Sequence, residues 1–406
     1  MKEWKTYKLS EIGQVIGGAT PSTKVASNYD GDIAWITPKD LSLLSGRYIY
    51  KGERSITEAG YKSCSCQMLP AGSILFSSRA PIGYIAIAGN DLCTNQGFKS
   101  VVPNPEIVNS HFLYYLLSYE KNRIAEMGSG TTFMEISGNV MKNIEVKLPH
   151  LSIQNKIAEI LTSLDEKIEN NQRINDNLEQ QAQALYKSWF VDFEPFKDGE
   201  FVESEIGEIP TGWTVVKFGD LTEIPKKTLN PQRFPDTIFK HYSLPACDNG
   251  LIPETQTGKD IMSNKIILQN NTTLFSKLNP RIKRIWFTCE VQANSICSTE
   301  FIPYRAKNET ESGYIFSIIN SAAFYASVMG CVNGATGSHQ RFHAEDTEDF
   351  LCAYNKEVVN EFSQHIDAIL KQMHDLREEN VKLALMRDTL LPKLMSGELI
   401  INEIDC

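Results

Sequence analysis

The stretch LSIQNKIAEILTSLDEKIENNQRINDNLEQQAQALYKSW, residues 151–189, decides the fold of this chain of 406 residues. Its seven-residue positions are Ile157, Leu164, Asn171, Leu178 and Leu185. Four of these five side chains are apolar, and charged or polar side chains fill most of the positions between them. This spacing is typical of a long amphipathic helix, which would extend about 58 Å at about 1.5 Å per residue. Such a stripe predicts a partner helix.

A second stretch of the same character lies near the end of the chain, from Val358 to Leu394. Its apolar residues alternate three and four positions apart, which predicts another long helix. Each seam contains a polar residue near its middle, Asn171 in the first and Asn380 in the second. A buried asparagine fixes the register of paired helices at a cost in stability. We therefore predict an intramolecular coiled coil; the alternative is that each stretch is an ordinary surface helix.

The two helices divide the chain into four predicted segments. These are block one (residues 1–150), the central helix and linker (151–206), block two (207–355) and the distal helix with the C-terminal tail (356–406). The length alone suggests two domains in addition to the helices.

The acidic charge of the chain lies mainly on its helices, although the net charge is −10. Residues 151–206 carry 5 basic and 12 acidic side chains, whereas block one carries 15 and 13 and block two carries 14 and 15. Each nearly neutral block could therefore present a basic face to DNA. No apolar run approaches the roughly 20 residues of a membrane span, and the first residues do not resemble a signal peptide. We expect a cytoplasmic protein.

Blocks one and two repeat each other. The opening WKTYKLSEI at Trp4 returns as WTVVKFGDL at Trp213, and ILFSSRAPIGYI around Phe76 returns as TLFSKLNPRIKRI around Phe275. A Gly/Ser/Thr-rich loop precedes the long helix in both, as MGSGTTF at 127–133 and VNGATGSHQRF at 332–342. The offset between the two copies drifts from 209 to 199 positions, and similarity of this kind predicts a duplicated structural unit with diverged loops.

Each block mixes strand and helix patterns, so the predicted class is α+β. The runs IAWIT, SILFSS, GYIAIAG, IEVKL, KIILQ and RIWFT, bounded by Gly, Pro and Asn, predict strands. One helix is predicted in each block, near residues 111–127 and near residues 311–329.

No motif for catalysis stands out. GSG at Gly128–Gly130 lacks the further glycine of a dinucleotide fingerprint, a P-loop is absent, and Ser77 and Ser78 lack the G-x-S-x-G elbow. The nine cysteines contain no CxxC pair. Three histidines are not spaced as metal ligands: His241, His339 and His343. We expect no catalytic site, bound cofactor or metal in this chain.

What remains is the chemistry of binding. Hydroxyl groups suit contacts to phosphate, whereas Arg and Gln can read guanine and adenine edges. Two DNA-binding domains held apart by a rigid spacer are typical of proteins that bind two half-sites. The candidate DNA-contacting residues are Ser77, Ser78, Arg79, Ser129, Thr131 and Thr132 in block one, and Lys277, Arg281, Lys283, Arg284, Ser338, Gln340 and Arg341 in block two.

Three stretches resemble conserved regions of the specificity (S) subunits of type I restriction–modification systems. Leu148–Phe196 resembles the central conserved region, and Gly199–Trp213 resembles the start of the second target-recognition domain. MRDTLLPKLMSGEL at 386–399 resembles the distal conserved region, except that Met386 replaces the leucine of the family pattern. The resemblance spans the whole chain, strongly in the helices and weakly inside the blocks.

The resemblance implies two target-recognition domains joined by an antiparallel intramolecular coiled coil, each reading one half of a bipartite double-stranded DNA target. It also implies that the chain is not an enzyme. A methylation subunit, usually in two copies, would supply S-adenosylmethionine-dependent adenine methylation, and a restriction subunit would supply cleavage driven by ATP and Mg. The acidic helix faces and FVDFEPF at 190–196 would be docking surfaces for these partners.

Two other hypotheses remain open at this point. One is a coiled-coil protein–protein adaptor whose duplicated domains bind peptides. The other is a stand-alone enzyme that modifies nucleic acid.

Overall fold

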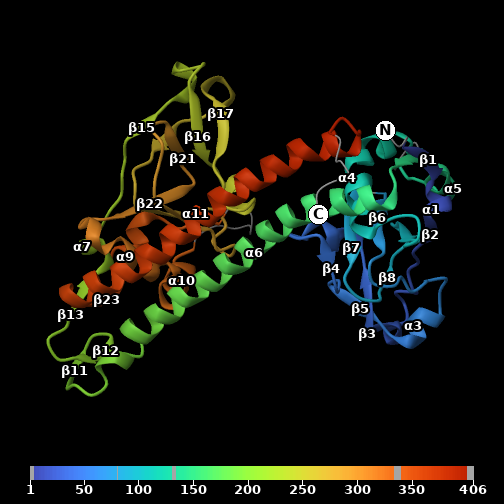
Figure 1. The fold of residues 1–406 in the computed structure, drawn as a ribbon. Coiled ribbons are helices and arrows are strands. Elements are labelled where there is room, and N and C mark those ends of the chain that lie inside the picture. The colour runs from blue at the N-terminus through green and yellow to red at the C-terminus, as the bar shows by residue number, and fades with distance from the viewer. Residues whose placement is uncertain (1–3, 80, 130–133, 333–339, 400–406) are drawn as a thin grey trace. The chain divides into compact units, whose positions relative to one another are not determined.

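The computed structural model describes residues 4–79, 81–129, 134–332 and 340–399 (Figure 1). Contacts between Cα atoms divide the chain into two compact units. The first unit is Met1–Glu169 with Lys382–Cys406, and the second is Asn170–Val381. Each unit contains one block and part of each long helix, so neither helix belongs to one unit alone.

Both predicted long helices are present. Helix α6 spans Leu151–Phe190 and helix α11 spans Lys356–Met395, 40 residues each. Helix α6 ends before Phe193, whose left-handed backbone (φ 50°) cannot continue a right-handed helix. At the start of α11 the side chain of Asn355 accepts a hydrogen bond from the backbone N–H of Val358 at 3.2 Å. In the described parts of the chain, no helix is both long and apolar enough to cross a membrane.

In the second unit α6 and α11 pack against each other in opposite directions. Asn171 contacts Asn380, and the ring of Trp189 lies 5.7 Å from that of Phe362, measured between centroids. Residue numbers therefore rise along α6 as those of the partners fall along α11. The predicted antiparallel intramolecular coiled coil is confirmed, and Figure 1 shows its helices in green and red.

The asparagines of the two seams meet inside this pairing. Nδ2 of Asn171 donates hydrogen bonds to Oδ1 of Asn380 at 2.8 Å and to Oε2 of Glu379 at 2.7 Å. Asn171 is fully buried. Sliding one helix past the other would separate this buried amide from both partners, which is costly. The contact is what a register-setting pair requires.

Replacing both Asn171 and Asn380 by leucine is expected to keep or raise the melting temperature while loosening the register. Exchanging both partners of a buried hydrogen bond for apolar groups is nearly neutral or stabilising, and it removes the preference for one alignment. Spin labels on the exposed faces of α6 and α11 should then give a broader distance distribution. The matched control is Asn177→Leu, the same change at an exposed position of α6. A distribution as narrow as that of the unaltered chain would contradict the register role.

Block one is built on two sheets. A five-stranded sheet has the order β2-β9-β6-β7-β4, and a three-stranded sheet has the order β5-β3-β8. Strand β6 is central and completely buried, and helix α4 packs against β7. An antiparallel β1–β10 pair joins the first and last strands of the block. The elements are β1 Lys5–Lys8, α1 Leu9–Ile12, β2 Gly13–Gly17, β3 Tyr29–Ile36, α2 Pro38–Ser42, β4 Tyr48–Ile49, β5 Arg54–Ile56, α3 Glu58–Lys62, β6 Ile74–Ser78, β7 Ile82–Ala88, β8 Cys93–Thr94, β9 Lys99–Pro103, α4 Ser110–Glu126, α5 Gly138–Asn143 and β10 Glu145–Leu148.

Block two is also built on two sheets. Their strand orders are β14-β22-β19-β20 and β15-β18-β21-β16-β17, and an antiparallel β13–β23 pair closes the block. The elements are β13 Thr214–Lys217, α7 Phe218–Leu221, β14 Thr222–Glu223, β15 Thr228–Leu229, β16 Ile238–Tyr242, α8 Leu244–Asp248, β17 Glu254–Thr257, β18 Lys265–Ile267, β19 Thr272–Ser276, β20 Ile285–Thr288, β21 Ser295–Ser298, β22 Phe301–Ala306, α9 Ser312–Asn320, α10 Ala322–Gly330 and β23 Leu351–Tyr354.

The two blocks share one topology. The order β14-β22-β19-β20 repeats β2-β9-β6-β7, and β17-β16-β21 repeats β5-β3-β8. Even the pairing directions agree, because β3 is parallel to β8 as β16 is parallel to β21. Block one adds β4 to its first sheet, and block two adds β18 and β15 to its second. The duplication predicted from the sequence is confirmed, and each predicted strand run contains a strand.

The prediction of a single helix near residues 311–329 is wrong, because two helices occupy this stretch. Helix α9 ends at Asn320 and α10 begins at Ala322. Between them Ser321 is extended (φ −71°, ψ 151°), and its hydroxyl accepts the backbone N–H of Phe324 at 3.2 Å. Serine favours this capping conformation because its side chain replaces a missing backbone partner. In block one the predicted helix forms as α4.

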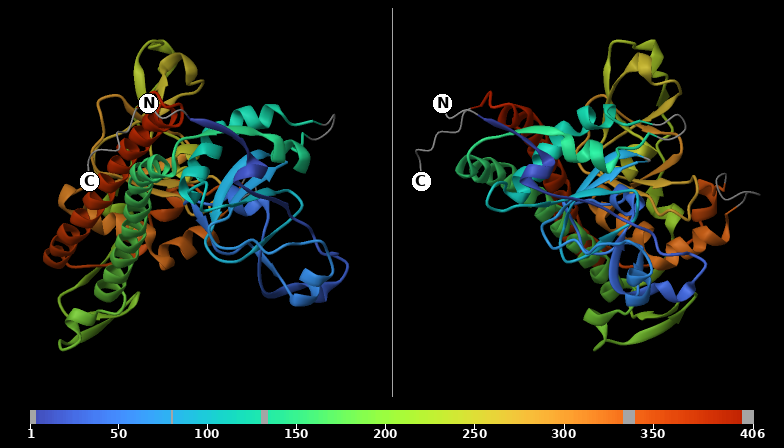
Figure 2. Two further views of the ribbon diagram at one scale, coloured as in Figure 1. Left: turned by 45° about the vertical axis from the view of Figure 1, so that its right-hand side comes forward. Right: turned by 90° about the vertical axis from the view of Figure 1, so that its right-hand side faces the viewer.

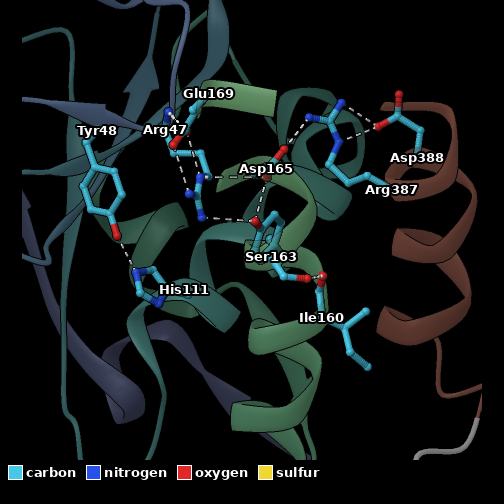
Figure 3. Close-up of polar contacts among 10 residues, drawn as sticks. Arg47, Tyr48, His111, Ile160, Ser163, Asp165, Glu169, Arg387 and Asp388 are labelled. Atoms are coloured by element: carbon cyan, nitrogen blue, oxygen red, sulfur yellow. Dashed lines mark hydrogen bonds and ion pairs between the residues drawn. The ribbon is translucent and has the colours of Figure 1, made fainter. Parts of the chain in front are cut away.

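A buried cluster of charged residues joins block one to the parts of α6 and α11 that belong to the first unit (Figure 3). Arg47 donates hydrogen bonds to both carboxylate oxygens of Glu169, at 3.0 and 3.1 Å. Asp165 accepts from the hydroxyl of Tyr115 at 2.6 Å and from Arg387 at 2.7 Å. Burial opposes the charge of Arg47, but Glu169 and the other neighbouring groups outweigh it and raise the pKa of the guanidinium above its usual value.

The segment after α6 folds back as a hairpin of β11, Phe201–Ser204, and β12, Gly207–Pro210 (Figure 2). The ring of Trp213 lies 5.5, 5.4 and 5.1 Å from those of Phe190, Phe193 and Phe196, respectively. The aromatic side chains of FVDFEPF therefore pack inside the second unit. Its two acidic side chains, at positions 192 and 194, are exposed.

Candidate DNA interface

The described candidate residues of block one, Ser77, Ser78, Arg79 and Ser129, gather where strand β6 ends. The backbone N–H of Ser78 donates to the carbonyl of Gly97 at 2.7 Å. The next residue, Arg79, forms an isolated antiparallel bridge with Glu135, the second described residue after the Gly/Ser/Thr-rich loop. We name this site junction one, made of residues 77–79, 97–99 and 135–136.

An equivalent site lies where strand β19 of block two ends. The backbone N–H of Lys277 donates to the carbonyl of Glu300 at 2.9 Å, and Leu278 forms an isolated antiparallel bridge with Arg341. We name this site junction two, made of residues 276–278, 300–302 and 341–342. The same backbone arrangement therefore occurs once in each block: a residue whose N–H donates across the sheet is followed by a residue that forms a bridge. We call this arrangement the backbone frame.

This frame refines the alignment of the two blocks. The residues that follow the bridges, Ile136 and Phe342, are both fully buried. The structural counterpart of Phe342 is therefore Ile136, whereas the loop sequences had matched it with Phe133, which lies outside the described residues. The reason is that a buried position is defined by the sheet and accepts any apolar side chain of suitable size.

Ser77 and Ser78 lie inside block one. The hydroxyl of Ser77 donates to the carbonyl of Pro81 at 2.8 Å and accepts the backbone N–H of Tyr84 at 2.8 Å. The hydroxyl of Ser78 donates to the carbonyl of Gly97 at 3.1 Å. Both residues are fully buried, because β6 is the central strand of its sheet. A contact with DNA would require these hydroxyls to leave their partners.

The remaining candidates of block one differ in exposure. Arg79 is half-buried and Ser129 is exposed. The backbone of Ser129 exchanges two hydrogen bonds of 3.1 Å with Glu135, which places it at the edge of junction one. Three candidates lie outside the described residues: Thr131, Thr132 and Ser338.

The turn after β19 contains three basic candidates in different situations. The side chain of Arg281 is exposed. The ammonium group of Lys283 donates to the carbonyl of Asn320 at 2.7 Å. Arg284 donates through Nε and Nη2 to the carboxylate of Asp248, at 2.6 and 2.8 Å, and this pair raises the pKa of the guanidinium.

The other described candidates of block two belong to junction two or adjoin it. Lys277 is half-buried, and the carbonyl of Gln340 accepts the backbone N–H of Asn279 at 2.8 Å. Arg341 donates through Nε and Nη2 to the carboxylate of Glu300, at 3.1 and 3.3 Å. The hydrogen bonds with Glu300 raise the pKa of the Arg341 guanidinium.

Sequence reasoning missed three charged residues of the junctions, Lys99, Glu135 and Glu300. Lys99 contacts Glu135 at 3.3 Å across 36 positions of the sequence, and Arg341 contacts Glu300 across 41. No local pattern signals such pairs. Aligning the two repeats by their strands would have placed Glu135 opposite Arg341 and drawn attention to the change of charge.

The junctions offer charged donors and acceptors whose directions are set by ion pairs, which is chemistry suited to recognition through hydrogen bonds. Across the described ranges, no group of three or more His, Cys, Asp or Glu side chains is placed to hold a metal ion.

Comparison with known proteins agrees with this architecture. Residues 1–180 match the family model of the type I restriction modification DNA specificity domain. The type I restriction enzyme MjaIX specificity subunit of Methanocaldococcus jannaschii is 33% identical, over 99% of this chain and 95% of its own length. The HindI specificity subunit of Haemophilus influenzae is 32% identical over 48% of this chain and 43% of its own. The crystal structure of a type I restriction–modification S subunit from M. genitalium shares the fold, with a TM-score of 0.60, 15% identity and 96% of both chains covered. The chain belongs to the family of type I restriction enzyme specificity subunits.

Proposed function

We propose that this chain selects the DNA target of a type I restriction–modification complex, acting in the cytoplasm. Block one would read one half of a bipartite double-stranded target and block two the other half. The observation that carries the proposal is the backbone frame of junctions one and two, which occurs once in each block. Two similar DNA-binding domains suit a target that consists of two short half-sites separated by a gap of unspecified sequence.

The paired helices suit the role of a spacer. Helices α6 and α11 run without interruption through both units, and a coiled coil is stiff compared with a flexible linker. Phosphate contacts would then position each block, base contacts would select the half-site, and helix length would set the number of base pairs between the halves.

In this proposal the chain contributes recognition, and partner subunits contribute the chemistry. A methylation subunit, in two copies, would methylate adenine with S-adenosylmethionine, and a restriction subunit would cleave DNA with ATP and Mg. This division fits a chain with a net charge of −10, because part of the affinity for DNA would come from basic surfaces of the partners.

The linker after α6 is the docking surface that we propose for a partner. Its phenylalanines are occupied inside the second unit, so the contact falls to its acidic side chains. Those that are exposed are Asp192, Glu194, Asp198, Glu200, Glu203, Glu205 and Glu208. A partner surface rich in Lys and Arg would match them.

A genome-wide map of methylated adenines, with and without this gene, tests the proposal. We expect deletion of the gene to remove methylation from one bipartite motif, because no other chain would bring the methylation subunit to that sequence. Restoring the gene is the control, and it should restore the same motif.

If no motif is lost, purified chain and methylation subunit should be combined with DNA carrying random sequences. Methylation without sequence preference in that mixture would contradict the proposal.

A further inference from the structure

Junction one contains an ion pair between the first residue of β9 and the bridge residue Glu135. The ammonium of Lys99 lies 3.3 Å from Oε1 of Glu135 and 3.5 Å from the hydroxyl of Ser78. The side chain of Lys99 is 15% exposed and that of Glu135 is 40% exposed. The lysine is therefore the inner member of the pair, and the carboxylate faces the surface.

Junction two contains an ion pair of the opposite polarity. Nε and Nη2 of Arg341 lie 3.1 and 3.3 Å from the carboxylate oxygens of Glu300. The side chain of Arg341 is 39% exposed and that of Glu300 is 29% exposed. Here the outer member carries positive charge.

Glu135 and Arg341 occupy the same position of the repeated frame. Each forms the bridge to the residue that directly follows the N–H donor of its junction: Arg79 follows Ser78 in block one, and Leu278 follows Lys277 in block two. Each is followed by a fully buried apolar residue. The backbone has therefore been kept while the charge of the outer side chain has been reversed. Two related domains that bind different half-sites need a conserved backbone with different side chains at the positions that contact the bases.

We propose that positions 135 and 341 each read a base edge in the major groove, with opposite hydrogen-bonding roles. Arg341 donates to O6 and N7 of guanine, and Glu135 accepts from the N4 amino group of cytosine. Glu300 and Lys99 are positioning residues, which hold the reading side chains through the ion pairs. This inference rests on the function proposed above.

Among the described residues, the side-chain hydrogen bonds of Arg341 go to Glu300 and use one edge of its guanidinium. A guanidinium has five N–H groups in one plane. Glu300 takes one from Nε and one from Nη2. The second N–H of Nη2 and one N–H of Nη1 lie side by side at the end of the guanidinium and form the fork that matches guanine. Holding the group in place before binding reduces the side-chain entropy lost on contact.

The carboxylate of Glu135 can likewise form further hydrogen bonds. Oε1 contacts Lys99, and an ionised carboxylate has further lone pairs on both oxygens. Oε2 is therefore able to accept from an amino group. Neither oxygen can donate, so a carboxylate at this position disfavours guanine O6 and thymine O4, which are also acceptors.

The test is the methylated motif made by the complete complex in cells that carry variants of this chain. Arg341→Lys keeps the positive charge but loses the fork, so we expect the preference for guanine at one position of one half to fall by about 5- to 150-fold. The other half should stay unchanged. A motif identical to that of the unaltered chain would overturn the role of Arg341.

Glu135→Gln provides the matched test in block one. Glutamine both donates and accepts, and it pairs with adenine N6 and N7, so one position of the other half should change from cytosine towards adenine. A cytosine retained at every position of that half would overturn the role of Glu135.

The positioning role of Glu300 has its own readout. Glu300→Gln should weaken the guanine preference at the position affected by Arg341→Lys, and Glu300→Asp should restore part of it. A residue that only stabilises the fold would lower methylation at every site and leave the motif as it was, which would overturn this role.

Changes that break exposed ion pairs elsewhere in the blocks serve as controls. Lys217 pairs with Asp349 at 2.7 Å, and Lys39 pairs with Glu53 at 2.7 Å, all four with well-exposed side chains. Lys217→Ala and Glu53→Gln should leave the motif unchanged; an altered motif in either would show that general charge, rather than the junctions, determines it. Failure of the unaltered chain to direct a bipartite motif would overturn the proposed function, and this inference with it.

Discussion

Asp165→Ala is expected to destabilise the first unit by about 3–5 kcal/mol. Asp165 is buried, accepts from the hydroxyl of Tyr115 and pairs with Arg387. Its carboxylate also lies 4.0 Å from Nε of Arg47, whose side chain is 4% exposed. Without this carboxylate, Arg47 and Arg387 lose a negatively charged partner. Water cannot replace it at Arg47, because that side chain is buried. Amide hydrogen exchange over α4 (residues 110–126) should reveal the loss of protection.

The second unit supplies an internal control for this experiment. Helix α9 belongs to it, so the exchange of residues 312–320 should stay slow in the same sample. Glu159→Ala is the matched control variant, because it removes an exposed carboxylate from the same helix. We expect its effect to be within about 0.5 kcal/mol. Equal exchange of α4 in the two variants would show that the charged cluster contributes nothing to stability.

Inserting one heptad into both long helices is expected to lengthen the unread gap of the DNA target by about three base pairs. Seven residues add about 10.5 Å of helix, and B-DNA rises about 3.4 Å per base pair. The insertions belong between Asn171 and Leu178 in α6, and between Met373 and Asn380 in α11. There they preserve the contact between the two asparagines and extend both seams on one side of it. Mapping the methylated motif measures the gap.

The longer target should also be methylated more slowly. A heptad returns to nearly the same face of a helix, with a drift of about 20°. Three base pairs turn B-DNA by about 100°, given about 10.5 base pairs per turn. An insertion in α6 alone is the control; it misaligns one seam against the other, and we expect it to destabilise the chain. A gap of unchanged length after the paired insertion would contradict a spacer role for the helices.

The long helices and the duplication could be predicted from the sequence because both are periodic along the chain. Apolar residues at seven-residue intervals indicate α6 wherever its partner lies, and the paired Trp4 and Trp213 motifs indicate a repeat without any knowledge of the sheets. Helix α6 accordingly begins at Leu151, as predicted. Asn171 and Asn380 can also be recognised in the sequence, because each interrupts an apolar seam, and the two side chains are hydrogen-bonded in the structure.

Tertiary structure decided which side chains the junctions expose. The sequence makes Ser77 and Ser78 candidate contacts to DNA, but the order of strands places them on the buried central strand, where backbone groups take their hydrogen bonds. Lys99 and Glu135 become a pair only when the start of β9 and the bridge residue meet across 36 positions of sequence. The physical reason is that periodicity is carried by neighbours along the chain, whereas accessibility and ion pairing depend on packing between distant segments.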